Sequence, residues 1–160
     1  MGNPQGRRRL NKHHTKLKGD VGLSAIIKDL TIKGYFVSIP VSENAPFDLI
    51  ASDDHTNYRV QVKARSVYRG AVEIQFRTSW ADRHGTHYTR YAGADFDVLA
   101  IYVLDADRCL YFKPKGELSV TIRLEEPLNN QSSGVRTWRE FQSFPPSETI
   151  RDTPKGHGPR

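Results

Sequence analysis

Asp48, Gln61 and Lys63 are the residues of this sequence whose types and spacing best suit a chemical role. Asp48 precedes a short apolar run, and Gln61 and Lys63 lie in a second run after a polar turn over residues 52–57. Side chains alternate between the two faces of a strand, so Gln61 and Lys63 would share one face, opposite Val60, Val62 and Ala64. Carboxylate and amide oxygens bind hard cations, and a lysine can orient water or neutralise phosphate charge. The set therefore suits Mg²⁺-assisted cleavage of a phosphodiester bond.

The elements that would position these residues are one helix followed by a mostly β chain. A helix is expected over residues 21–33, with Asp20 as its cap, Gly34 beyond its end and an apolar stripe at helical spacing. The stripe consists of Leu23, Ile26, Ile27 and Leu30. Strands are expected over 35–41, around Asp48, around Lys63, and over 71–77, 96–104, 109–113 and 118–124, with a short helix over 138–144. This order indicates an α/β (α+β) core with a mixed sheet.

Residues 78–94 show no sustained hydrophobic period, so a loop is expected there. The segment interleaves arginine and histidine with aromatic rings. Such a loop could pack its rings on the sheet, or it could contact the phosphates and grooves of a nucleic acid. The sequence leaves both interpretations open.

Composition narrows the class of protein. The 160 residues fit one domain, and the net charge of +6 favours a polyanionic partner. Cys109 is the only cysteine, which excludes an intramolecular disulfide and a cysteine zinc site. No apolar run approaches the length of a membrane span, so we expect a soluble, intracellular protein without a membrane partner. Residues 1–19 read as a flexible basic arm, 20–142 as the folded domain and 143–160 as a disordered tail.

Short motifs along the first half of the chain resemble the PD-(D/E)XK nuclease superfamily, with glutamine in the (D/E) position. They resemble in particular its group I intron-associated homing endonucleases. The motifs are His13-His14-Thr15-Lys16, Lys18-Gly19-Asp20, Gly34-Tyr35, Pro40, Phe47-Asp48-Leu49-Ile50 and Arg59-Val60-Gln61-Val62-Lys63. The resemblance covers about residues 13–66 and continues weakly through Tyr91-Ala92 and Asp95-Phe96-Asp97 into the strand that follows.

The resemblance implies a restriction-endonuclease-like core with flanking helices, and a metal-dependent DNA endonuclease that uses Mg²⁺ or Mn²⁺. It makes Asp48 and Gln61 the metal ligands and Lys63 the catalytic lysine. Many family members add a glutamate from the first helix, and that position falls here at or next to the apolar Leu23. Asp20 or Glu43 could replace it, although a helix cap and a loop acid are the simpler readings of those two residues.

Double-stranded DNA is the implied partner, and recognition of a long site implies a homodimer or homotetramer. The candidate DNA-binding residues are Arg7, Arg8, Arg9, Lys12, Lys16, Lys18, Arg65, Arg69, Arg77, Arg83, His84, Tyr88 and Arg90. Two alternatives stay open. One is a non-catalytic DNA-binding protein that keeps the nuclease fold, and the other is a junction-resolving or repair nuclease.

Overall fold

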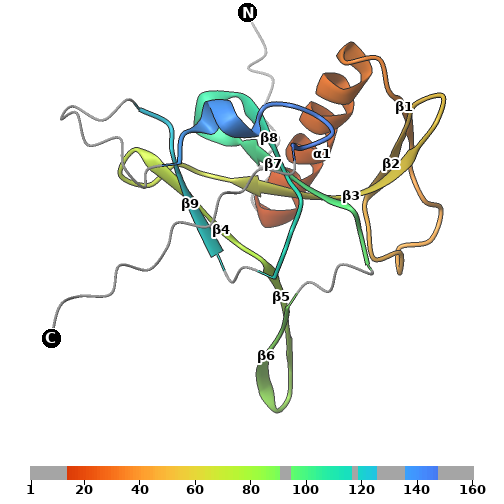
Figure 1. Cartoon of the computed structure of the whole chain (residues 1–160). Coiled ribbons are helices and arrows are strands. Elements are labelled where there is room, and N and C mark those ends of the chain that lie inside the picture. The colour runs from red at the N-terminus through yellow and green to blue at the C-terminus, as the bar shows by residue number, and fades with distance from the viewer. Residues whose placement is uncertain (1–13, 91–94, 117–118, 126–135, 148–160) are drawn as a thin grey trace, which may run out of the picture.

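A five-stranded mixed sheet forms the centre of the computed structural model, which describes residues 14–90, 95–116, 119–125 and 136–147 (Figure 1). Its strand order is β1-β2-β3-β7-β8, in which β3 and β7 run parallel and the other neighbours antiparallel. The strands are β1 (Phe36–Ser38), β2 (Leu49–Ser52), β3 (Asn57–Arg65), β7 (Val98–Val103) and β8 (Arg108–Phe112). β7 is buried along its whole length, which its continuous apolar sequence favours.

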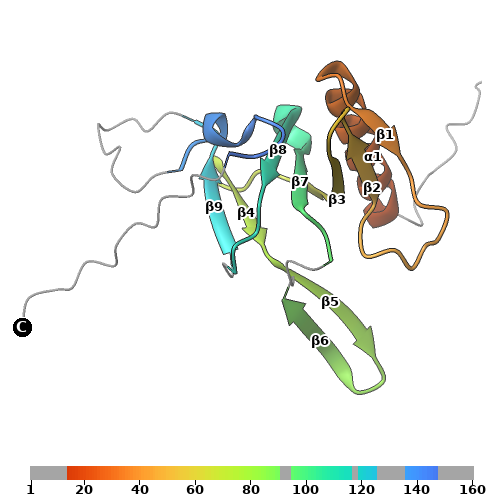
Figure 2. The same cartoon turned by 45° about the vertical axis from the view of Figure 1, so that its right-hand side comes forward.

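Helix α1 (His14–Ile32) covers one face of the sheet (Figures 1 and 2). The predicted stripe is confirmed, because Ile26 and Leu30 are fully buried against sheet residues such as Leu49 and Val60. Gly34, with a φ of 91°, ends the helix, and the amide of Tyr35 returns a hydrogen bond to the carbonyl of Leu30.

The start of α1 differs from the expectation. The helix begins at His14, so Asp20 lies inside it and is not its cap, and Lys16 and Lys18 are helical residues. The first turns carry no buried stripe, since Thr15, Lys16, Leu17 and Gly19 are exposed. Hydrophobic periodicity therefore could not reveal this part of the helix.

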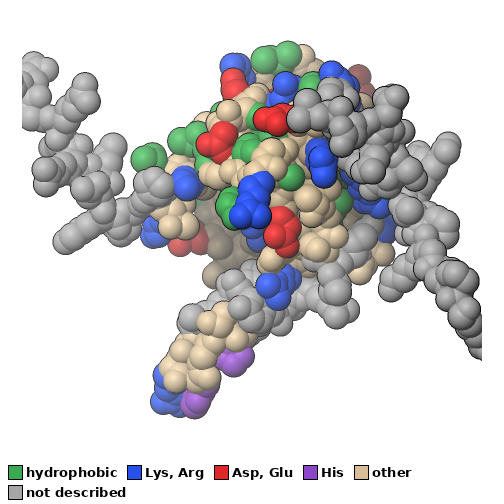
Figure 3. Space-filling model, turned by 90° about the vertical axis from the view of Figure 1, so that its left-hand side faces the viewer, with side chains coloured by type: hydrophobic (Ala, Val, Ile, Leu, Met, Phe, Trp, Pro, Cys, Tyr) green, Lys and Arg blue, Asp and Glu red, His purple; other side chains and the backbone are tan. Residues whose placement is uncertain are grey.

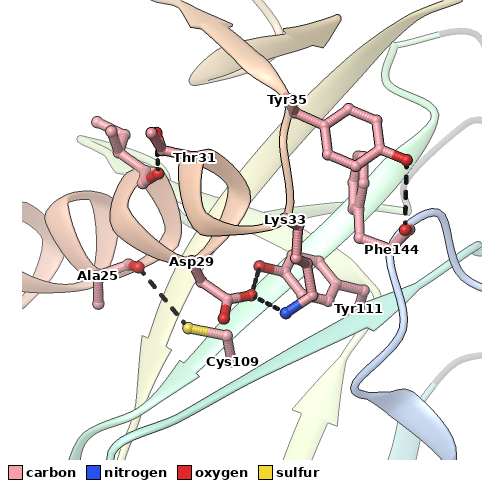
Figure 4. A network of polar contacts seen from close by, with 9 residues as sticks. Ala25, Asp29, Thr31, Lys33, Tyr35, Cys109, Tyr111 and Phe144 are labelled. Atoms are coloured by element: carbon pink, nitrogen blue, oxygen red, sulfur yellow. Dashed lines mark hydrogen bonds and ion pairs between the residues drawn. The ribbon is translucent and has the colours of Figure 1, made fainter. Parts of the chain in front are cut away.

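Polar contacts connect the C-terminal end of α1 to β8, the last strand of the sheet (Figure 4). The hydroxyl of Tyr111 on β8 donates to Asp29 at 2.5 Å, and Lys33 forms an ion pair with the same carboxylate at 2.6 Å. The thiol of Cys109 lies 3.8 Å from the carbonyl oxygen of Ala25. The helix is thus fixed to the sheet by both apolar packing and directed hydrogen bonds.

The other face of the sheet is covered by a two-stranded ribbon of β4 (Ala71–Gln75) and β9 (Ser119–Arg123). Val72, Ile74 and Ile122 of this ribbon are fully buried, in one cluster with Leu99 and Ile101 of β7. A 3₁₀ turn, η1 (Leu104–Ala106), connects β7 to β8, and the two strands pair as an antiparallel hairpin.

The C-terminal part of the described chain contributes to both cores. The expected short helix appears as a 3₁₀ helix, η2 (Trp138–Phe141), whose Phe141 ring stacks on Phe112. Phe144 then packs among the rings of Tyr35, Tyr58 and Tyr111 on the helix side. Helical structure therefore begins before residue 20, and packed side chains continue past residue 142 to Phe144, beyond the expected domain boundaries.

A hairpin of β5 (Arg77–Asp82) and β6 (Gly85–Arg90) projects from the body of the molecule (Figures 1 and 2). The expected loop over residues 78–94 is therefore wrong for residues 78–90. Residues 91–94 lie outside the described part of the chain. Within the described residues, no helix combines the length and apolar character that crossing a lipid bilayer requires.

Candidate active site

Asp48 lies where the pairing of β2 with β3 begins. The backbone amide of Asp48 donates to the carbonyl of Val60 at 2.9 Å, and the two strands are in register from Leu49 opposite Val60 onward. Beyond this pair the backbone ladder ends, and the side chain of Asp48 makes the hydrogen bonds to β3 instead. Its Oδ2 accepts hydrogen bonds from the backbone amide of Val62 at 2.7 Å and from Nε2 of Gln61 at 2.5 Å. The carboxylate thus satisfies an amide that β2 leaves unpaired.

Gln61 and Lys63 lie on the face of β3 that is turned away from the helix. Val60, their neighbour on the strand, is fully buried under α1, and residues alternate along the strand. Nζ of Lys63 lies 3.4 Å from the carbonyl oxygen of Arg77, the first residue of β5. The structure therefore brings Asp48 and Gln61 into contact and sets Lys63 beside them, at the base of the projecting hairpin.

Burial disfavours charge on both ionisable groups of this site. Desolvation raises the pKa of Asp48 above its ordinary value, although the bonds from Val62 and Gln61 and the charge of Lys63 act in the opposite direction. Desolvation also lowers the pKa of Lys63 to about 8, with help from the neighbouring charge of Arg65 and against the attraction of Asp48. A charged ligand that compensated either group would therefore be favoured here.

The donor atoms of the site fit a hard divalent cation, but only one of them carries a charge. A carboxylate and an amide oxygen are ordinary Mg²⁺ ligands. The Gln61 amide now presents Nε2 to Asp48, so its oxygen would reach a shared cation only after the amide turned over. In the described part of the chain, no group of three His, Cys, Asp or Glu side chains is placed to hold a metal ion. A divalent cation should therefore bind only weakly to the protein without DNA.

The two proposed replacements for the helix glutamate do not complete the site. Asp20 is exposed on α1, and Glu43 is exposed in the loop before Asp48. Leu23 packs against the helix-side cluster, as its place in the apolar stripe predicted. The absence of a three-acid group among the described residues means that Asp20, Glu43 and Asp48 do not jointly form a metal centre.

The candidate DNA-binding residues fall into separate groups. Arg65 and Arg77 flank Lys63, since Arg65 lies two residues along β3 and Arg77 provides the carbonyl that Lys63 contacts. Arg69 is exposed in the turn before β4, and Arg83 and His84 are exposed at the hairpin tip. Lys16 and Lys18 lie in the first turns of α1. Arg7, Arg8, Arg9 and Lys12, and the side chains of Tyr88 and Arg90, lie outside the described part of the structure.

An ion pair between Arg59 and Asp97, for which the sequence predicted no role, fixes β3 from the side of β7. Asp97, just before β7, accepts hydrogen bonds from the Arg59 backbone amide at 2.8 Å, from Nε at 3.1 Å and from Nη2 at 2.9 Å. The Asp97 amide returns a bond to the Arg59 carbonyl at 2.9 Å. The Arg59 guanidinium holds the pKa of Asp97 below its ordinary value. The opposite charges at the starts of two apolar strands were the available signal.

Comparisons with known proteins agree with this geometry. The sequence matches the family described as PD-(D/E)XK endonuclease over residues 13–144. Among solved structures, the bacterial homing endonuclease I-Ssp6803I is similar, with 26% identity over 74% of this chain and 83% of that one and a TM-score of 0.63. Among curated proteins, no sequence matches significantly. The predicted resemblance and the restriction-endonuclease-like fold are thus confirmed. Because the family match spans most of its length, this chain belongs to the PD-(D/E)XK endonuclease family.

Proposed function

We propose that the chain is a DNA endonuclease that hydrolyses phosphodiester bonds of duplex DNA with the help of Mg²⁺ or Mn²⁺. The observation that carries this proposal is the contact of the Asp48 carboxylate with Gln61, with Lys63 on the same face of β3. Membership of an endonuclease family and the similarity to a homing endonuclease support it.

Each residue has a distinct role in this proposal. The Asp48 carboxylate and the Gln61 amide oxygen would hold the cation, which when bound polarises a phosphoryl oxygen and acidifies water. Lys63, with a pKa of about 8, is mostly protonated at pH 7 and can neutralise the charge that develops on the phosphate. Its smaller deprotonated fraction can accept a proton from an attacking water through the same Nζ.

The single fixed charge of the site implies that DNA and metal bind together. Phosphate oxygens would supply the negative charge that a second acid provides in other sites of this kind. We therefore expect weak metal affinity in the free protein and a marked increase when duplex DNA is present.

Cutting both strands of a duplex requires two such sites, so the proposal includes a homodimer or homotetramer. Apolar side chains at the sheet edge support self-association. Phe36 on the edge strand β1 is 72% exposed, and Ile39 and Val41, just beyond it, are also exposed. Sedimentation of the full chain, compared with a Phe36→Ser variant, measures the oligomeric state and the contribution of this edge.

A plasmid-nicking assay with Mg²⁺ or Mn²⁺ tests the nuclease function. Wild type is expected to nick supercoiled DNA, Lys63→Ala to lose at least a hundredfold in rate, and Lys28→Ala, at an exposed position on α1, to match wild type. Equal nicking by wild type and Lys63→Ala would contradict the proposal.

A second candidate function is a DNA-binding protein that has lost catalysis. The neutral Gln61 and the apolar Leu23 favour it, because together they remove two of the acids expected of the family. Wild type that binds duplex DNA but cuts no plasmid with either metal would support this alternative. Cutting confined to four-way junctions would instead indicate a junction-resolving nuclease.

A further inference from the structure

The β5–β6 hairpin is a two-stranded ribbon whose tip is exposed. Its strands pair in register from Arg77 opposite Arg90 to Asp82 opposite Gly85, leaving a two-residue turn of Arg83 and His84. The residues from Asp82 to Thr86 are all exposed. Figure 3 shows arginine and histidine side chains at the end of this projection, away from the body of the molecule. An exposed ribbon of this kind adds no apolar burial at its tip, so stability alone does not account for it.

The tip is held in one shape by its own side chains. Oδ1 of Asp82 accepts a hydrogen bond from the backbone amide of His84 at 2.7 Å and contacts Nε2 of His87 at 3.0 Å. Nε of Arg83 donates to Nε2 of His84 at 3.0 Å. The acid is therefore engaged within the turn, and the guanidinium still has four further N–H groups to offer a partner. Because these bonds already order the tip, its binding to a partner loses less conformational entropy than the binding of a flexible loop would.

The base of the hairpin starts at the candidate active site. The carbonyl of Arg77, where β5 begins, is the group that Nζ of Lys63 contacts at 3.4 Å. Six residues of extended strand span about 20 Å at about 3.3 Å per residue. Successive nucleotides of one DNA strand are about 3.4 Å apart, so the ribbon reaches across about six base pairs.

We propose that the β5–β6 hairpin enters the major groove of duplex DNA and reads base pairs within about six of the phosphate beside Lys63. A major groove about 12 Å wide admits a two-stranded ribbon, whereas a minor groove about 6 Å wide does not. Arginine and histidine at the tip offer donors for the N7 and O6 acceptors of guanine. This inference deepens the proposed nuclease function and rests on it for the position of the cut.

A shortened hairpin isolates the role of the ribbon. Replacing residues 79–88 with Asn-Gly keeps the pair of Thr78 and Thr89 and the Arg77 carbonyl, and Asn-Gly suits a tight hairpin turn. The removed segment contains one acid, Asp82, and one arginine, Arg83, so the formal net charge does not change. Loss of sequence preference in this variant could not be ascribed to a lower overall charge.

The probe is a 40-base-pair duplex library with a randomised centre, from which full-length wild type and variants select bound DNA. Wild type is expected to enrich a defined sequence, and the shortened variant to enrich it at least tenfold less. Arg123→Ala, an exposed substitution on β9, is expected to select as wild type does. A double substitution at the tip, Arg83→Ala with His84→Ala, leaves the strands intact and should lower enrichment at least fivefold. This double variant replaces the shortened one in the test if the shortened protein does not melt cooperatively.

Methylation interference on the selected duplex identifies the groove. Methylation of guanine N7, in the major groove, should weaken wild-type binding at positions within about six base pairs of the cut, and the effect should disappear in the shortened variant. Interference only from adenine N3, in the minor groove, would overturn the inference. So would enrichment of the same sequence by the shortened variant, or wild type that binds duplex DNA without preference.

The two proposals fail in different ways. A wild type that selects DNA through the hairpin but cuts nothing keeps the groove assignment and loses the nuclease function. A wild type that cuts duplex DNA without any sequence preference keeps the nuclease function and loses the groove assignment. Wild type that retains no duplex at all overturns both and directs attention to a protein or RNA partner.

Discussion

Gln61 donates a hydrogen bond of 2.5 Å from Nε2 to Oδ2 of Asp48. The neutral amide therefore compensates a partly buried carboxylate that would otherwise have to rely on Val62 and Lys63. A glutamate in the same place would set two carboxylates against each other whenever no cation lay between them. Glutamine at this position thus favours a metal-free site that is stable, at the expense of affinity for the metal.

Substituting Gln61→Glu should make folding depend on metal. Without a divalent ion at pH 7, the variant is expected to be less stable than wild type by about 1–2 kcal/mol, because two partly buried carboxylates adjoin. The deficit should shrink toward pH 5, where one of the pair takes up a proton. Thermal melts with EDTA and with Mg²⁺ measure both effects, and Mg²⁺ should raise the melting temperature of the variant more than that of wild type. Equal metal-induced shifts would contradict the assignment of Gln61 as a metal ligand.

Lys63 should cost stability at neutral pH while serving catalysis. Its folded-state pKa of about 8 lies below the unfolded value of about 10.5, so the unfolded chain binds more protons between these pH values. The contribution of Lys63 to wild-type stability should therefore rise as the pH increases from about 8 to 10.5. In metal-free protein, Lys63→Met should melt higher than wild type at pH 7 and lose this advantage across that window.

A matched control separates this effect from the general loss of a lysine. Lys28→Met changes an exposed lysine of α1, and its melting difference from wild type should stay flat over the same pH range. If the melting difference between Lys63→Met and wild type were equally flat with pH, the assignment of a lowered pKa to Lys63 would be contradicted.

The pair of Arg59 and Asp97 should stabilise the fold in a pH-dependent way. The pKa of Asp97 is held below its ordinary value, so this stabilisation is present above the unfolded pKa of about 3.9 and is lost as the pH falls through the folded value. Both side chains are more than one third exposed, so Arg59→Met should lower the stability only modestly at pH 7. Chemical unfolding at pH 7 and pH 3 tests this, and a cost undiminished at pH 3 would assign the effect to packing instead.

The parts of the fold that the sequence predicted are those that bury an apolar face. The stripe through Ile26 and Leu30 and the continuous run of β7 are visible as patterns because each packs against the core. The contact between Asp48 and Gln61 could be predicted because strand alternation and a short turn are local features of the sequence. Their catalytic roles remain predictions.

The hairpin escaped prediction for the opposite reason. Its described tip, residues 82–86, is exposed, so the sequence there carries no alternation of apolar and polar residues. The weaker signals in the sequence were threonine and aromatic residues with high strand propensity and a glycine at position 85. In the structure Gly85 has a φ of 126°, which suits a tight turn. The pairing of β4 with β9 joins segments distant in the sequence and has no local signature.

The close approach of α1 to β3 yields a prediction with an internal control. Gly22 faces β3, and a Cβ built there would lie 3.0 Å from the Cβ of Ala64, the residue next to Lys63. Gly19 lies one turn earlier on the same helix, and a Cβ there would meet nothing within 4 Å. Alanine is favoured over glycine in a helix by about 1 kcal/mol, so Gly19→Ala should raise the melting temperature.

Gly22→Ala gains the same helix propensity but must force the helix and β3 apart, which costs about 1–3 kcal/mol. We therefore expect it to melt lower than Gly19→Ala and to nick DNA more slowly, because a shift of β3 moves Lys63 relative to Asp48. Melting curves and nicking rates of the two variants, measured side by side, provide the test. If both alanines stabilised the protein equally, close packing of α1 on β3 would not be what positions Lys63.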